Sequence, residues 1–464
     1  MTPDISRARG GRRADRHTRD RRNTGRTTLA TGADTLRVLT RVLAPLAARG
    51  LIVRRPRVTA WLEHRDADRR AVELLRGLRR RHGPGPLRLR IPGRSIVVLL
   101  DRNDVRRVLH ATPEPFSPAT REKRGALAHF QPYGVLISRG PARAERRRLV
   151  EQALDTDVPI HRHGSAVTAK AREEADRLAD TVLRTGTLTW GEFGPAWWRL
   201  VRRVVLGDQA SEDHEISDLL TTLRARANWS YLSPRQPRAR RRFARLLSEY
   251  VGRAEPGSLA AAVANTPSSP DAMPISQIPQ WLFAFEPAGL VTLRALALLA
   301  SHPRHAERAR AEAEAVVDDT PRELPYLRAC LLESVRLWPT TPALLRETTE
   351  ETDLLGVALP RRTTVLIVTP LFHRDPETLP GADRFDPAVW LEGRADDQWS
   401  LLPFSGGPGR CPGRDLVLLT ASTALAVLLN RTRPRLLSTP SLDPRRPLPG
   451  TVDPYSVRLA ITPR

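Results

Sequence analysis

The stretch PFSGGPGRCPGRD, residues 403–415, decides the fold. A single cysteine, Cys411, stands among glycines and is followed by Pro412 and a long apolar run over residues 416–429. The run predicts a buried helix, with Cys411 in its first turn and Pro412 at the first helical position, where proline loses no hydrogen bond. Free backbone N–H groups and the helix dipole at that end favour a thiolate. Because glycine lets the backbone approach a large flat ligand, the stretch predicts a thiolate ligand for haem iron.

The same residues resemble a known family. The haem loop of the cytochromes P-450, Phe-x-x-Gly-x-Arg-x-Cys-x-Gly, is matched at Phe404, Gly407, Cys411 and Gly413. The basic residue of that motif falls on Gly409, and Arg410 stands one place later. A plain buried cysteine in a glycine-rich turn is the alternative reading of this loop. The resemblance implies haem b (iron protoporphyrin IX) as cofactor and Cys411 as its iron ligand.

A second motif precedes the cysteine. In ACLLESVRLWP, Glu333 and Arg336 are three residues apart and share one face of a predicted helix. They resemble the Glu-x-x-Arg signature of the family, which an arginine from a later loop completes, and Arg384 in GADRFDPAVW stands at that place. Buried charges of this kind need full pairing, so the resemblance implies a lock on local geometry. Glu-x-x-Arg alone is common on exposed helices; its order and spacing before Cys411 favour the family.

The resemblance also implies cations for the two haem propionates. Arg346 matches a propionate-binding arginine, ten residues beyond the Glu-x-x-Arg signature. The His-x-x-x-Arg of the family is represented by Arg143 and Arg147, four apart on one helical face. Arg410 is a further candidate, because glycine at position 409 supplies no charge. In a chain so rich in arginine, only the spacing singles these residues out.

The predicted helix over residues 278–299 departs most from the family, which has Ala/Gly-Gly-x-Asp/Glu-Thr there. Counting back from Pro303 without a gap places Glu286 on the acid and Pro287 on the threonine. An alignment that shifts the acid by one residue needs a deletion. Proline lacks an N–H and crowds the carbonyl four residues earlier, so we expect a kink that opens a groove beside the haem. Glu286 then relays protons or, alternatively, forms a structural salt bridge.

Further helices are predicted at residues 143–154, 165–185, 193–206, 213–228, 239–253, 306–317 and 325–337, and a hairpin at residues 86–91 and 95–100. The resemblance implies a mainly α fold, a large helical body with a small β-sheet subdomain, in a single domain over residues 35–464. Residues 1–33 are basic and poor in apolar side chains, which predicts a disordered tail. Nucleic-acid binding by this tail is less favoured than a solvated arm.

Composition limits the remaining possibilities. The chain has 464 residues, a formal net charge of +24 and two cysteines, so it has no disulfide framework and suits a reducing cytoplasm. No apolar run long enough to span a membrane and no signal-peptide core stand out. Apolar segments at residues 114–138 and 341–345, with Phe283 and Phe285, correspond to parts that cover the haem in the family and suit a hydrophobic substrate.

The resemblance implies a soluble bacterial haem-thiolate monooxygenase of secondary metabolism, which oxidises a hydrophobic small molecule with O2. No Gly-x-Gly-x-x-Gly motif of a fused reductase is present, so ferredoxin and ferredoxin reductase are the expected electron donors. Two alternatives remain open. Pro287 marks an atypical member that performs coupling, cyclisation or peroxide-driven oxidation, or the chain is a non-catalytic haem-binding protein.

Overall fold

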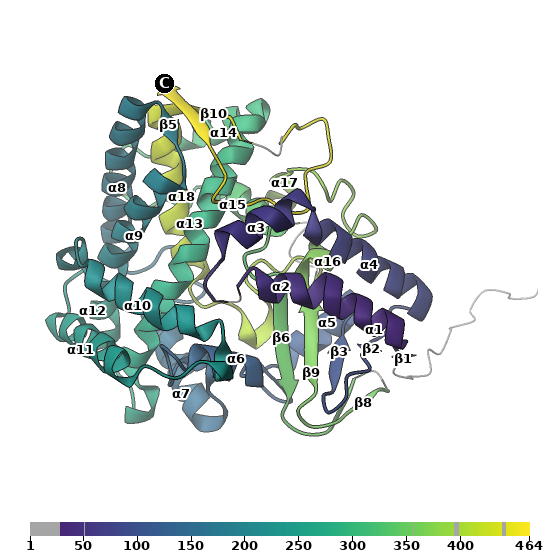
Figure 1. The fold of residues 1–464 in the computed structure, drawn as a ribbon. Helices are drawn as coiled ribbons and strands as arrows, with labels where there is room; N and C mark the ends of the chain where they lie inside the picture. The colour runs from purple at the N-terminus through teal and green to yellow at the C-terminus, as the bar shows by residue number, and fades with distance from the viewer. Residues whose placement is uncertain (1–27, 51, 355, 394–398, 439–441) are drawn as a thin grey trace, which may run out of the picture.

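The computed structural model describes residues 28–50, 52–354, 356–393, 399–438 and 442–464 (Figure 1). Most of the predicted basic tail, residues 1–27, lies outside the described residues. The last part of that predicted tail belongs to the folded body, because β1 (Thr28–Leu29) pairs with a strand of the main sheet and α1 (Gly32–Val38) follows it.

The main sheet has six strands in the order β1-β2-β3-β9-β6-β4. Its central strand β9 (Thr364–Val368) is buried throughout and rich in β-branched residues, as expected for a strand covered on both faces. The predicted hairpin is confirmed in shorter form, with Leu87 opposite Val98. The other strands of this sheet are β2 (Leu87–Arg88), β3 (Ile96–Val98), β4 (Phe116–Ser117) and β6 (Ala343–Thr348).

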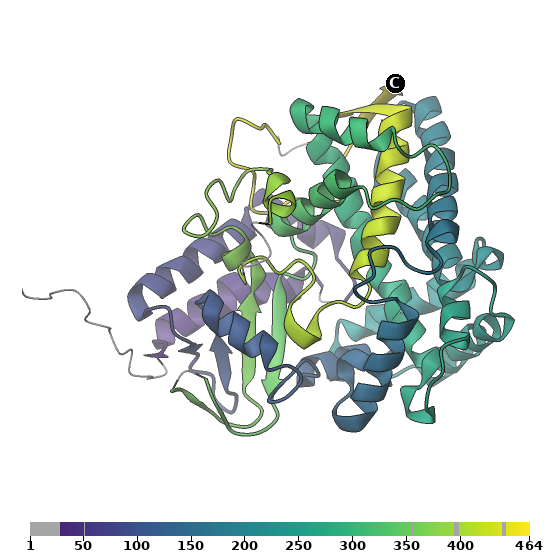
Figure 2. The same cartoon turned by 180° about the vertical axis from the view of Figure 1, so that it is seen from behind.

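Helices of the N-terminal third cover this sheet. In Figure 1, α1, α2 and α4 lie in front of the strands, and in Figure 2 the blue helix α5 crosses them from the other side. These elements bury one apolar cluster that is separate from the larger helical core. Their bounds are α2 (Ala44–Ala48), α3 (Pro56–His64), α4 (Ala67–His82), α5 (Arg102–His110) and α6 (Arg121–Leu127), with a π-helical turn, η1 (Leu39–Leu43), before α2.

The larger part is a helical body beside the sheet (Figures 1 and 2). Its long helices agree with the predicted ones to within a few residues. They are α7 (Gly140–Ala153), α8 (Gly164–Thr185), α9 (Trp190–Leu206), α10 (His214–Ala227), α11 (Pro237–Arg253), α13 (Ile278–Ser301), α14 (Pro303–Ala313), α15 (Pro325–Leu337) and α18 (Arg414–Arg431). A short helix that the sequence did not predict, α12 (Leu259–Ala264), lies between α11 and α13 in the chain. Short elements complete the fold: α16 (Thr369–His373), α17 (Ala388–Leu391), a sheet of β5 (Thr187–Leu188), β10 (Thr432–Leu436) and β11 (Leu459–Pro463), and a hairpin of β7 (Thr352–Asp353) and β8 (Ala358–Leu359).

Two helices form the centre of the body. Helix α18 is apolar on nearly every side and packs among α8, α14 and α15, as the run after Cys411 predicted. Helix α13 crosses the body beside α9 and α15. The segment Pro270–Ser301, which contains α13, is long and apolar enough to cross a membrane, contrary to the sequence-based expectation, but 78% of its most apolar stretch is buried inside the fold. Such burial is typical of the core helix of a globular protein.

Candidate functional site

The cysteine loop lies just before α18. This helix begins at Arg414 with Gly413 as its N-cap, so Cys411 and Pro412 precede it. The predicted helical position of Pro412 is therefore wrong: the turn places Cys411 outside the helix. The backbone N–H of Cys411 donates to the carbonyl of Phe404 at 2.9 Å, which closes the loop. Its side chain keeps some accessible surface, as a ligand facing a cavity must.

The sequence predicted that the helix end lowers the pKa of Cys411 and so favours a thiolate. In the structure, the pKa of this thiol is raised instead. Burial is the largest effect and raises the pKa of Cys411, while the backbone N–H of Gly413 and the positive charge of Arg147 lower it by less. Desolvation of the charged form therefore outweighs the helix end. A metal ion reverses this balance, because a thiol that coordinates a metal is deprotonated.

Gly407 fixes the course of the loop. Its φ is +60°, and a side chain there would place its Cβ 2.3 Å from the carbonyl oxygen of Leu109 on α5. The loop thus lies directly on α5, a close approach that only glycine allows in this backbone conformation. Gly409 is less crowded, but a Cβ at this position would still lie 3.0 Å from Nη2 of Arg346. The guanidinium of Arg346 occupies the space into which the motif's basic side chain would extend.

Three cations meet beside this loop. Arg346 is 2% exposed and donates to the hydroxyls of Thr112 at 3.0 Å and Ser405 at 3.2 Å. Arg143 is also buried, and its Nε has no hydrogen-bond partner. Burial, then the charge of Arg346, lower the pKa of Lys123 to about 7, and burial, then Arg143, lower that of Arg346 to about 10.

Among the described residues, none of these three cations forms an ion pair. A cluster of desolvated cations without a counter-charge is costly, so it calls for anionic groups in the same space. Two propionates would answer that requirement, and the roles of Arg346 and Arg143 as propionate ligands stay predictions. Sequence reasoning missed Lys123, although it is one of the two lysines of the chain and lies within the predicted covering segment.

Two arginines predicted as propionate ligands have other partners. Arg147 donates to Glu151 at 2.6 Å and to the carbonyl of Arg410 at 3.0 Å, so it holds the cysteine loop. The Arg410 side chain is partly exposed and pairs with Asp157. Both guanidinium groups therefore have carboxylate partners within the protein, Glu151 on the same helix for Arg147 and Asp157 for Arg410, and their roles at the propionates stay predictions.

The Glu-x-x-Arg pair is fully buried and saturated. Arg336 binds Glu333 with two hydrogen bonds, at 2.6 and 2.7 Å, and also donates to the carbonyls of His373, Ala382 and Arg384. Glu333 in turn accepts from the backbone of Asp386 and the indole of Trp390. The predicted side-chain role of Arg384 is wrong: its side chain is exposed and, within the described chain, pairs with neither residue. The backbone carbonyl of Arg384 accepts a hydrogen bond from Arg336 instead. Glu333 needs no second arginine, because the backbone N–H of Asp386 and the indole N–H of Trp390 already donate to it.

On α13, the helix continues through Pro287. The indole N–H of Trp197 on α9 donates to the carbonyl of Phe285 at 2.7 Å, which supports the backbone beside the proline. Glu286 forms a salt bridge with Arg224 of α10, which is the structural alternative left open by the sequence. Phe283 faces Phe130 of the covering segment, with ring centroids 5.7 Å apart. This apolar pair meets where α13 and the covering segment adjoin.

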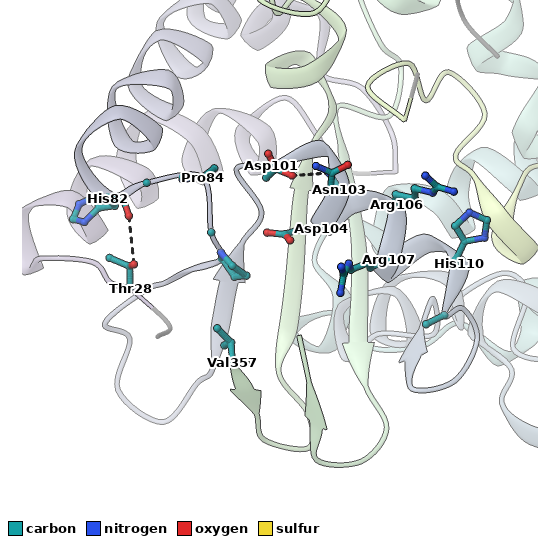
Figure 3. Close-up of a pocket in the computed structure, with 14 residues that line it drawn as sticks. Thr28, His82, Pro84, Asp101, Asn103, Asp104, Arg106, Arg107, His110 and Val357 are labelled. Carbon is teal, nitrogen blue, oxygen red and sulfur yellow. Dashed lines mark hydrogen bonds between the residues drawn. The ribbon is translucent and has the colours of Figure 1, made fainter. Parts of the chain in front are cut away.

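A large cleft of about 950 Å³ lies elsewhere, between α5 and the loop after α4 (Figure 3). Its walls carry Asp101, Asp104, Arg106 and His82. Cys411 and the cation cluster do not line it. Its charged, open walls contrast with the buried loop, so we assign the chemistry to the loop and not to this cleft.

The residues at the cysteine loop fit a haem. A partly accessible thiol, an unpartnered buried Nε on Arg143, and glycines that leave no room for side chains suit a flat, dianionic cofactor with a metal at its centre. The sequence profile of the family described as Cytochrome P450 matches residues 290–451, which include Glu333, Arg336 and Cys411. This match supports the cytochrome P450 superfamily for the part of the chain that carries these motifs.

Two bacterial relatives of this chain come from Streptomyces melanosporofaciens. Cyclooctat-9-en-7-ol 5-monooxygenase is 37% identical over 162 residues, which cover 33% of each protein. Cyclooctatin synthase is 38% identical over 148 residues, 32% of each. The chain matches about a third of the length of these relatives.

The fold of this chain has a solved counterpart. It superimposes on the crystal structure of the cytochrome P450DA heme domain with a TM-score of 0.65, covering 85% of this chain and 93% of that domain at 16% identity. The predicted mainly α fold with a small sheet is thus confirmed.

Proposed function

We propose that this P450 is a soluble, cytoplasmic haem-thiolate monooxygenase that oxidises a hydrophobic small molecule with O2. The observation that carries the proposal is the half-buried Cys411 on a loop that packs against Arg346, which lies near the cations Lys123 and Arg143. Haem b bound there supplies the redox chemistry. Electrons come from ferredoxin and ferredoxin reductase, and secondary metabolism is the setting that the names of the two Streptomyces relatives favour.

Each residue of the site has a proposed role that follows from its position. Cys411 would hold the iron, and Lys123, Arg143 and Arg346 would hold the propionates. Phe283 and Phe130 give the substrate side an apolar surface, which suits a largely hydrocarbon substrate. Arg224 holds the carboxylate of Glu286 and so orients the acid nearest the position where the family has its threonine.

The direct test is spectroscopic. The full-length protein, supplied with haem, should give the reduced-plus-CO spectrum of thiolate-bound haem, and hydrophobic compounds should shift its spin state. Cys411→Ala should lose the thiolate signature, whereas Cys330→Ala, a buried cysteine on α15, should keep it. A colourless wild-type protein, or an unchanged Cys411→Ala spectrum, overturns the proposal. The absence of any spin shift and any product with surrogate ferredoxin would favour a non-catalytic haem protein.

A second candidate, peroxide-driven oxidation, is favoured by one observation. The oxygen-side helix has Pro287 in place of the threonine, and the neighbouring acid is held in an ion pair. Both features depart from the arrangement that relays protons to O2 in the family. Turnover with hydrogen peroxide in the absence of redox partners, at a rate above that with NADPH and ferredoxin, would select this alternative.

A further inference from the structure

Thr156 contacts the peptide that follows Cys411. Its hydroxyl donates to the carbonyl oxygen of Pro412 at 3.0 Å, across 256 residues of sequence. Leu154, two residues before it, lies against Gly413, where an added Cβ would be in ordinary contact with its side chain at 3.6 Å. The segment after α7 therefore packs on the Pro412–Gly413 peptide.

The segment that carries Thr156 is tightly held. Its flanking residues, Asp155 and Asp157, adopt left-handed conformations with φ of 46° and 69°. Arg162 fixes Asp155 through its backbone N–H at 2.6 Å and its guanidinium at 2.8 Å. The N–H of Thr156 itself donates to the carbonyl of Glu151 at 3.0 Å. A hydroxyl presented by such a fixed loop keeps one orientation toward its acceptor.

The carbonyl of Pro412 and the N–H of Gly413 belong to one planar peptide unit and point in opposite directions. The backbone N–H of Gly413 acts as a donor toward the Cys411 thiol and lowers its pKa. A donor on the carbonyl side therefore fixes the peptide plane and polarises the N–H that reaches the sulfur. The neighbouring Arg410–Cys411 peptide is different, because Arg147 caps its carbonyl but its N–H goes to Phe404.

We propose that Thr156 is a positioning residue that tunes the haem ligand through the Pro412–Gly413 peptide. This inference rests on the proposed function, in which Cys411 binds iron. Hydrogen bonds to a ligating sulfur withdraw electron density from the metal and raise its reduction potential. Thr156 thus strengthens the N–H···S hydrogen bond from the far side of the peptide and moderates electron donation by the thiolate.

The experiment compares three full-length, haem-loaded variants by midpoint potential and by the iron–sulfur stretching frequency. Thr156→Val keeps the shape of threonine and removes the donor, so its potential should shift to more negative values and its stretching frequency should rise. Thr156→Ala should shift both in the same directions. Thr156→Ser retains the hydroxyl and should restore the wild-type values. These readouts do not depend on turnover.

Thr420→Val is the matched control. Thr420 lies in α18, is fully buried, and donates to the carbonyl of Leu416 at 2.8 Å, so the variant loses a comparable hydrogen bond away from the loop. If Thr156→Val and Thr156→Ala shift no further than this control, the inference is wrong while the thiolate assignment stands. If wild-type protein lacks the thiolate spectrum, the proposed function itself fails.

Discussion

Asp104 is an aspartate with an unusual environment. It is 1% exposed on the wall of the cleft, in the first turn of α5, and its Oδ2 has no hydrogen-bond partner (Figure 3). Burial, then the nearby charge of Asp101, raise its pKa to about 7, and Arg107 lowers it by less. The folded protein therefore holds a proton on this carboxyl at pH values where the unfolded chain has released it.

Replacing Asp104 by asparagine tests this assignment. Because the pKa is raised in the folded state, wild-type stability should fall as pH rises from about 4 to about 7. The variant lacks this loss, so Asp104→Asn should exceed wild type in free energy of unfolding by about 2 kcal/mol at about pH 8 and by little at about pH 4. Denaturant unfolding at both pH values measures the difference. Asp218→Asn, at an exposed position of α10, should show no such dependence.

Helix α13 contains two prolines in contrasting positions. Pro279 lies in the first turn, where its missing N–H has no partner to lose, and Pro287 lies in the interior. Because proline has no backbone N–H, Pro287 cannot donate the helical hydrogen bond to the carbonyl of Phe283. The indole of Trp197 donates to the carbonyl of Phe285, two residues after Phe283. This hydrogen bond compensates only part of the stability lost at Phe283.

The two prolines predict different responses to alanine. Pro287→Ala should raise the free energy of unfolding by about 1–2 kcal/mol, less than the roughly 3 kcal/mol typical of interior proline because neighbouring helices support the site. Pro279→Ala should leave stability within about 0.5 kcal/mol. Thermal unfolding of the haem-loaded proteins compares them. A destabilised Pro287→Ala would mean that the ring packs favourably and that the helix has adapted to it.

For the molecule as a whole, Arg336 joins parts that are distant in sequence. From α15 it binds the carbonyl at the end of α16 and two carbonyls in the loop before α17, while Glu333 holds the backbone of that same loop. The loop leads on to the cysteine segment. Removing one member leaves the other charge buried without a partner, so the lock fails as a unit.

Arg336→Lys should therefore lower the free energy of unfolding by about 3–5 kcal/mol, although the charge is retained. Lysine has a single ammonium group and cannot reach the carboxylate and the carbonyls together. Arg242→Lys is the control, because Arg242 and its partner Glu215 are exposed and such pairs contribute about 0.5 kcal/mol. Urea unfolding and the fraction of haem retained measure both. Equal effects of the two substitutions would contradict a role for Arg336 as the lock.

The sequence predicted the long helices and the fold because apolar periodicity and the two motifs are local signals. Several of its errors at the site concern side-chain direction. Arg147, Arg410 and Arg384 stand at the expected places, yet carboxylates or backbone groups from other segments decide where their side chains go. Lys123 was missed for the converse reason, since only the folded chain brings it beside Arg346. A sequence motif does not show how many acceptor groups in the folded protein compete to pair with one guanidinium.

The crowding between Gly409 and Arg346 has a consequence for how this loop can change over evolutionary time. A basic side chain added at position 409 would displace the arginine already there, and loss of Arg346 alone would leave the site short of one charge. Each single substitution is therefore disfavoured, although the paired exchange is neutral in charge. The two positions should vary together among descendants of this protein, as a compensated pair.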